Sequence, residues 1–196
     1  MANSNTPTGF RYIGNLAGTK AAPLVKCFIP ATDGTAVFPG DAVKVAGSAS
    51  STQTDCQTVA QAAATNAILG VVESVDQVDE IAIGSMNLNR LHRPASTAMF
   101  VYVRIDPNAM YEIQATTTLA ATDVGSNADI VVGAGNATLG LSGMQLDEST
   151  TDTTATLALK ILGIVNRPDN AVGASAKAIV LINNHQLKGG TGTAGV

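Results

Sequence analysis

The sequence predicts an all-β fold, built either as a compact barrel or as a sandwich of two sheets. Aliphatic and β-branched residues alternate with a period of two, and turn residues recur about every 10 to 20 positions. Charged residues make up only 13% of the 196-residue chain, which disfavours a helical bundle with ion pairs on its exposed faces. Strand patterns do not alternate with long helical patterns, so a doubly wound parallel sheet is not expected.

The composition divides the chain into three parts. Residues 1–20 are polar and rich in Gly and Thr, and we expect an N-terminal arm that is flexible or orders on a partner. Residues 21–188 carry the strand patterns of a single β-rich domain. Residues 189–196 are a Gly/Thr tail, expected to be disordered or docked on another subunit.

Seven stretches read as strands, with one predicted hairpin. The run "MFVYVRI" alternates well, "DPNA" (106–109) has the residues of a turn, and "MYEIQ" returns, so these segments predict a hairpin. The predicted strands are 24–30, the part of 34–47 that follows the turn Pro39-Gly40-Asp41, 99–105, 110–114, 128–133, 155–165 and 176–184.

Three further segments are less regular. Residues 58–69 are alanine-rich and suit either one short helix or a strand of small residues. In residues 131–140, Gly133 and Gly135 follow a predicted strand, but the third glycine of the dinucleotide-binding spacing is missing, so a β-turn is expected. Residues 146–154 lack the ligand spacing of a calcium loop and read as a solvated, Thr-rich loop.

Two apolar runs, "ILGVV" and "ILGIV", each carry a central glycine, Gly70 or Gly163. A glycine inside a strand often marks a bulge, a bend or the close approach of another backbone. Both runs are therefore predicted to be buried strands of a curved scaffold. A bulky residue at Gly163 is expected to harm folding.

The two cysteines, Cys27 and Cys56, are too few for a disulfide framework. Both lie in strand-like stretches, so two reduced and mostly buried thiols are expected, although neighbouring strands could bring them together to pair.

The sequence shows no recognisable set of catalytic residues, and the chain is not expected to be an enzyme. The two histidines, His92 and His185, stand in polar loops without the signature of a nucleophile and its base. The four Cys and His residues are scattered, so no metal site and no cofactor is expected. A weaker alternative is a small hydrolase or binding module with a β-barrel pocket, whose best residues would be His92, His185 and Asp106.

Charge and hydropathy limit the partners. The net charge is −4, without the basic stripe of a nucleic-acid binder, so no nucleic-acid partner is expected. No signal peptide or membrane-length apolar run is visible, and we expect a soluble protein made in the cytoplasm. The one basic cluster contains Arg90, His92 and Arg93; it suits a solvated loop or a contact patch for an acidic protein surface.

The strand and turn residues carry a family resemblance over residues 37–188. "PGDAVKVAG", "AILGVVESVD" and "VRIDPNAMYEIQ", with the later runs at 126–150 and 159–187, resemble the small decoration (cement) proteins of tailed-bacteriophage heads. These motifs are structural rather than catalytic, so no functional residue is carried over from the family.

The resemblance implies a compact β fold, either an open barrel of the tulip kind with extended terminal arms or a jelly-roll sandwich. It further implies a virion protein, made in the host cytoplasm, that binds the outside of the capsid as a homotrimer and clamps neighbouring major capsid proteins. The alternative within the virion is a tail, connector or fibre-associated protein, which copy number would distinguish.

Overall fold

The computed structural model describes residues 3–18, 23–47, 49–77 and 89–196. Within these ranges the chain forms strands and one short 3-10 turn, so the all-β prediction is confirmed. The elements are β1 (Arg11–Asn15), β2 (Leu24–Ile29), β3 (Ala42–Val45), β4 (Gln57–Gln61), β5 (Gly70–Val75), β6 (Met99–Arg104), β7 (Ala109–Gln114), β8 (Thr118–Leu119), η1 (Ala121–Asp123), β9 (Asn127–Val131), β10 (Gln145–Asp152), β11 (Leu159–Ile164), β12 (Gly173–Ala174) and β13 (Lys177–Ile182).

Five strands close a barrel in the order β2-β4-β3-β5-β6, and β6 pairs back onto β2. The pair β2–β4 is parallel and the other neighbours are antiparallel. Alternate residues point inward, which is why the period-two pattern predicted this unit. The interior is a solid aliphatic core of Cys27, Ile29, Val37, Val43, Val59, Leu69, Val72, Val101 and Val103. The predicted barrel therefore forms, and not the sandwich alternative.

Six strands form a second sheet in the order β1-β7-β13-β11-β9-β10. This sheet curls, because the start of β10 returns to the end of β7. Ala115 and Leu146 form an isolated parallel bridge, and the amide of Thr116 donates to the carbonyl of Leu146 at 3.0 Å. The strand β1 remains outside this closure as an edge strand. The short strands β8 and β12 pair separately.

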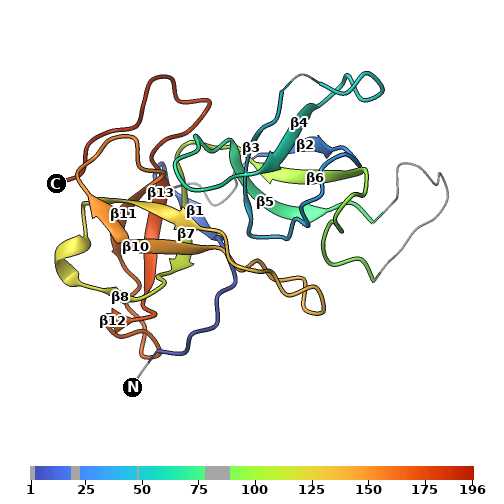
Figure 1. Ribbon diagram of the computed structural model, residues 1–196. Coiled ribbons are helices and arrows are strands. Elements are labelled where there is room, and N and C mark those ends of the chain that lie inside the picture. Colours follow the sequence, from blue (N-terminus) through green and yellow to red (C-terminus); the bar gives the residue numbers. More distant parts are fainter. Residues whose placement is uncertain (1–2, 19–22, 48, 78–88) are drawn as a thin grey trace.

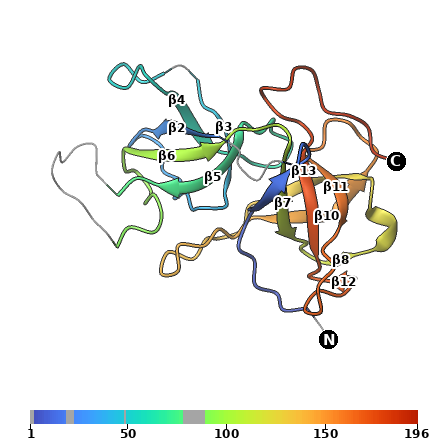
Figure 2. The ribbon, with the colours of Figure 1, turned by 180° about the vertical axis from the view of Figure 1, so that it is seen from behind.

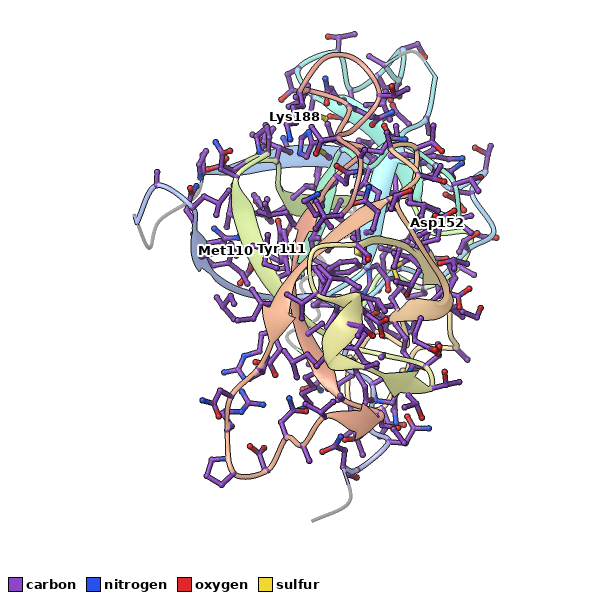
Figure 3. All side chains as sticks on the ribbon, turned by 90° about the vertical axis from the view of Figure 1, so that its left-hand side faces the viewer. Met110, Tyr111, Asp152 and Lys188 are labelled. Carbon is purple, nitrogen blue, oxygen red and sulfur yellow. The ribbon has the colours of Figure 1, made fainter. Side chains whose placement is uncertain are left out.

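The barrel and the curled sheet lie side by side and share one core, as Figures 1 and 2 show from opposite sides. Ala42, Ile68 and Val71 come from the barrel side and pack with apolar residues of the sheet. Tyr111 of β7, labelled in Figure 3, is fully buried there. The ring of Phe10 packs edge-on against it, with 5.7 Å between ring centroids. This shared core holds the two units as one body.

The predicted hairpin is wrong, although its two strands exist. The strand β6 pairs with β2 and β5 in the barrel, whereas β7 pairs with β1 and β13 in the curled sheet. The turn does form, since the amide of Ala109 donates to the carbonyl of Asp106 at 3.1 Å. It carries the chain from one unit to the other instead of folding it back on itself.

Two other segments differ from expectation. Residues 146–154, expected to be a solvated loop, instead form most of β10, which pairs with β9. For residues 58–69, the strand alternative holds and the helix does not: β4 occupies 57–61, and a turn follows. A run of alanines favours a helix only where tertiary pairing does not compete, and here two neighbouring strands pair with β4.

Both predicted arms contribute to the fold where they are described. Residues 11–15 of the N-terminal arm form β1. Further upstream, the carbonyl of Ser4 accepts a hydrogen bond from the Gln114 side chain at 2.6 Å. The C-terminal tail returns to its own chain, where the amide of Gly195 donates to the carbonyl of Thr153 at 2.9 Å.

The two central glycines have different surroundings. At Gly70, a Cβ atom would collide with the backbone carbonyl of Arg104 on β6, so the expected close approach is confirmed. At Gly163, a Cβ atom would meet no heavy atom within 4 Å. The register of β11 against β13 shifts between Ile161 and Gly163, which marks a bulge, but that bulge leaves room for a side chain. Alanine therefore fits at Gly163 without a clash, and the harm expected from a bulky residue there stays a prediction.

No disulfide joins Cys27 and Cys56 in the structure. Cys27 is fully buried in the barrel core, and burial, with a smaller effect of Cys56, raises its pKa to about 11. Its backbone lies opposite Gln57, the residue next to half-buried Cys56. Neighbouring strands thus bring the two residues near each other, and both stay reduced in the structure.

Candidate partner-contact surface

The loop that carries the basic cluster is anchored by Arg93, whose side chain is completely buried. Its Nε donates to the carbonyl of Thr97 at 2.7 Å, and Nη2 donates to the carbonyls of Pro30 and Asp33 at 2.7 and 2.9 Å. Nη1 donates to the carbonyl of Thr35. Arg93 is therefore a structural residue that joins the loops at 30–35 and 93–97, and its prediction as a partner contact is wrong.

The Arg93 guanidinium is balanced by one carboxylate and several backbone oxygens. Burial lowers the pKa of Arg93, and Asp33, 3.9 Å from Nη1, acts in the opposite direction. A buried charge is tolerated only when its hydrogen-bonding capacity is met, and the planar fork of five N–H groups suits several carbonyls at once. The cluster thus contributes one cation to the interior instead of to the surface.

His92 is also less available than expected. Its ring stacks on Phe38, with 4.7 Å between centroids and 11° between planes. Burial, and secondly the charge of Arg90, lower the pKa of His92. Arg90 itself is half-buried. With Arg93 inside and His92 stacked and less basic, the three residues do not form the predicted basic patch.

A hairpin-like loop, residues 132–143, packs against this region and is visible in Figures 1 and 2 below the barrel. Glycines allow the approach. A Cβ at Gly135 would overlap the ring of Phe38, and a Cβ at Gly140 would lie 2.5 Å from the Cβ of Leu91. The loop is internally held by a bridge between Asn136 and Leu141. Phe38 is therefore covered by His92 on its stacked face and is also in contact with Gly135.

This packing leaves three leucines exposed beside one another. Leu139 is 61% exposed, Leu91 is 46% exposed and Leu141 is 37% exposed. They are neighbours because Gly140, between Leu139 and Leu141, lies against Leu91. We call these three residues the leucine surface. Adjacent exposed leucines on a protein with little surface charge are typical of a protein-binding site.

A groove of about 320 Å³ adjoins the leucine surface. One wall is the loop, through Ala134, Leu139 and Leu141, and the other is the N-terminal segment, residues 6–8. That segment is fixed downstream, where the amide of Phe10 donates to the carbonyl of Gly40 at 2.9 Å. The groove and the leucines together offer an apolar, shaped and uncharged contact site.

The residues of the hydrolase alternative do not form an accessible catalytic site. His185 is only 2% exposed; its Nδ1 accepts the amide of Leu187 at 3.1 Å, and its Nε2 is buried with no hydrogen-bond partner in the described part of the chain. The charge of Asp106 raises the pKa of His185, but the Asp106 carboxylate accepts a hydrogen bond from the Asn15 side chain. His92, stacked on Phe38, is not among the groups that affect His185.

His185 makes stability depend on pH. Burial lowers its pKa from 6.5 to about 4, Asp106 opposes this, and Lys188 adds to it. Because the folded pKa lies below the unfolded one, this contribution is fully present above pH 6.5 and is lost as the pH falls towards 4. Between pH 6.5 and 4, His185 should lower the free energy of unfolding of the wild type by on the order of 2–3 kcal/mol, and we expect His185→Gln to lack this loss. Urea unfolding of both proteins at pH 7 and 4.5 measures it; equal pH dependence would contradict this assignment.

The described residues contain no group of three or more His, Cys, Asp or Glu side chains placed to hold a metal ion. In the acidic stretch of β10, Asp147 accepts hydrogen bonds from Ser149, and Asp152 from Thr153 and Thr154. In the same described ranges, no helix has the length and apolarity to cross a membrane.

Sequence reasoning missed the leucine surface because its residues are sequence neighbours of turn signals. Leu139 and Leu141 flank a glycine in "ATLGLSG", and Leu91 lies inside the basic cluster. An available signal was that apolar residues stood in a predicted turn, where polar residues are usual.

Comparisons with protein-family models, curated proteins and solved structures found no match for this chain.

Proposed function

We propose that this protein is a non-catalytic virion protein that decorates the outside of a tailed-phage capsid as a homotrimer and clamps neighbouring major capsid proteins. The observation that carries the proposal is the leucine surface, Leu91, Leu139 and Leu141, with its adjoining groove. The low charge of the chain and the structural use of its buried polar groups, such as Arg93, support binding rather than chemistry. The resemblance of residues 37–188 to decoration proteins supplies the partner.

The energetics suit a multivalent contact. Full burial of a leucine side chain contributes about 1.5–3 kcal/mol, so three half-exposed leucines give a weak contact for one copy. Linking several such contacts raises the apparent affinity by orders of magnitude without any new interaction. A trimer on a shell that repeats its binding positions would gain in this way. Sedimentation or light scattering should therefore give three times the 19.8 kDa mass of one chain.

A single substitution tests the surface. Leu139→Asp places a charge in the centre of the proposed contact and is expected to weaken capsid binding at least tenfold, or about 1.4 kcal/mol. Because Leu139 is 61% exposed, the thermal unfolding temperature should stay unchanged. Co-sedimentation with capsids stripped of this protein measures binding.

Val172 offers a matched control, since it is 60% exposed and lies in a different loop. Val172→Asp should bind capsids as the wild type does. Equal loss of binding by both variants would show that the added charge, and not the leucine surface, is responsible. Undiminished binding of Leu139→Asp would overturn the proposed surface.

A further inference from the structure

The last described segment, residues 191–196, is held by a specific docking site on its own chain. The amide of Thr193 donates to Oδ1 of Asn183 at 2.9 Å, and the amide of Val196 donates to the carbonyl of Gly125 at 3.2 Å. In addition, Nζ of Lys160 donates to the carbonyl of Ala194 at 2.9 Å. Figure 3 labels Lys188, where the tail leaves the loop after β13, and Asp152, at the end of β10 beside the docked segment.

Two buried amide side chains build this docking site. Asn127 is fully buried, and its Nδ2 donates to the carbonyls of Thr154 and Thr193 at 3.0 and 2.7 Å. Asn183 is 2% exposed; its Nδ2 donates to the carbonyl of Ala155 at 2.9 Å, while its Oδ1 accepts from Thr193. Buried amides are costly unless bonded, and the tail supplies one bond to Nδ2 of Asn127 and one to Oδ1 of Asn183, while the turn at 154–157 takes their other bonds.

The docking site also selects the sequence of the segment. A Cβ at Gly192 would lie 2.5 Å from Nδ2 of Asn183 and 2.7 Å from the carbonyl oxygen of Ala155. A Cβ at Gly195 would lie 3.0 Å from the backbone of Asn127. Ala194, between them, is exposed. The site therefore accepts a segment of the form Gly-Thr-Ala-Gly, excludes a side chain at Gly192 and crowds one at Gly195.

Two glycines with left-handed backbone conformations connect the segment to the domain. Gly189 and Gly190 have φ angles of 74° and 71°, and a Cβ at either position would meet nothing within 4 Å. Most hydrogen bonds of the docked segment are made through its own backbone groups, and Val196 is 86% exposed. Such contacts form equally well with the same segment of another chain.

We propose that this site is a peptide-binding site for extended Gly-Thr-Ala-Gly segments, and that in assemblies it takes residues 191–196 of a neighbouring copy. Every copy carries both the segment and the site, so the exchange is head-to-tail and can close a ring. In dilute solution the short connection keeps the segment on its own chain, because its effective concentration is about millimolar. Closure of a trimer by three exchanges rests on the proposed function; the peptide site does not.

The first experiment uses the full chain with Gly192→Val, whose own tail no longer fits its site. A fluorescent peptide of residues 188–196, KGGTGTAGV, should bind this chain at least tenfold more tightly than it binds the wild type. The matched control is Ala194→Val, which changes an exposed tail residue, leaves the site occupied and should bind as weakly as the wild type. A peptide with the Gly192→Val change should also lose at least tenfold. Absence of peptide binding to a folded Gly192→Val chain would overturn the site.

A second measurement on the wild type tests the site even if the Gly192→Val variant does not fold. The peptide of residues 188–196 with a spin label at its N-terminus, added to the wild type above about 1 mM, should broaden the side-chain amide resonances of Asn127 and Asn183. Resonances that keep their line width would overturn the site. Exchange between copies is tested by holding the wild type above about 1 mM and then diluting it onto a sizing column. Larger species should appear and fall at least fivefold in Gly192→Val, but not in Ala194→Val. Equal or absent larger species would overturn the exchange, and neither result involves a capsid.

Discussion

Replacing Arg93 with alanine is expected to lower the free energy of unfolding by about 3 kcal/mol and to weaken the proposed capsid binding only through this instability. The side chain is fully buried and donates to four backbone carbonyls in two loops, so its removal takes a donor from each of them and leaves a cavity. Urea unfolding at pH 7 measures the loss. Arg93→Lys should recover part of it, because a single ammonium cannot span the same carbonyls.

Arg11 provides the control for this change, since it is an exposed arginine on β1. Arg11→Ala should alter stability by less than about 0.5 kcal/mol. If Arg93→Ala unfolds at the wild-type urea concentration yet binds capsids poorly, Arg93 would be a contact residue after all, as its sequence context suggested. The structural assignment would then be wrong.

Gly70→Ala is expected to cost about 2–4 kcal/mol of stability, the second large effect. The added Cβ would lie 2.9 Å from the carbonyl carbon of Arg104 and closer still to its oxygen. Both atoms belong to the backbone of β6, and β6 is fixed by its pairing with β2 and β5. The closed barrel therefore has to distort, because no flexible side chain is available to move. Thermal and urea unfolding would report the change.

Gly163→Ala is the matched substitution in the twin motif and should be neutral or stabilising by up to about 1 kcal/mol. No heavy atom lies within 4 Å of the added carbon, and Gly163 is not among the glycines with a positive φ. Alanine would also restrict the unfolded chain. Equal destabilisation by both substitutions would contradict the distinction between a close backbone approach at Gly70 and an open bulge at Gly163.

The sequence predicted the architecture best where one face of a strand is buried. Alternating valines in 99–105 predicted a strand with one buried face, and Val101 and Val103 do line the barrel core. The same stretch gave a wrong strand pairing. A turn such as "DPNA" shows that the chain changes direction, but it does not determine which strands pair with each other. The residues that decide pairing lie far away in the chain, on β2, β5 and β13.

The functional residues were harder to predict, since composition does not reveal what a polar residue contacts. Arg93 resembles its neighbour Arg90 in sequence, yet the carbonyls that bury it come from residues 30–35 and 97. The tail looked structureless because glycine and threonine pack little, and its partners Asn127 and Asn183 gave no sign of their role. The leucine surface required the contact between Gly140 and Leu91, which joins two distant loops.

A reconstruction of tailed-phage heads assembled with this protein tests the proposed decoration function most directly. The proposal predicts many copies on the outer surface of the head, grouped in threes, with Leu91, Leu139 and Leu141 against the major capsid protein. Copies confined to a single ring at the tail or connector, or a leucine surface facing solvent in the particle, would contradict it.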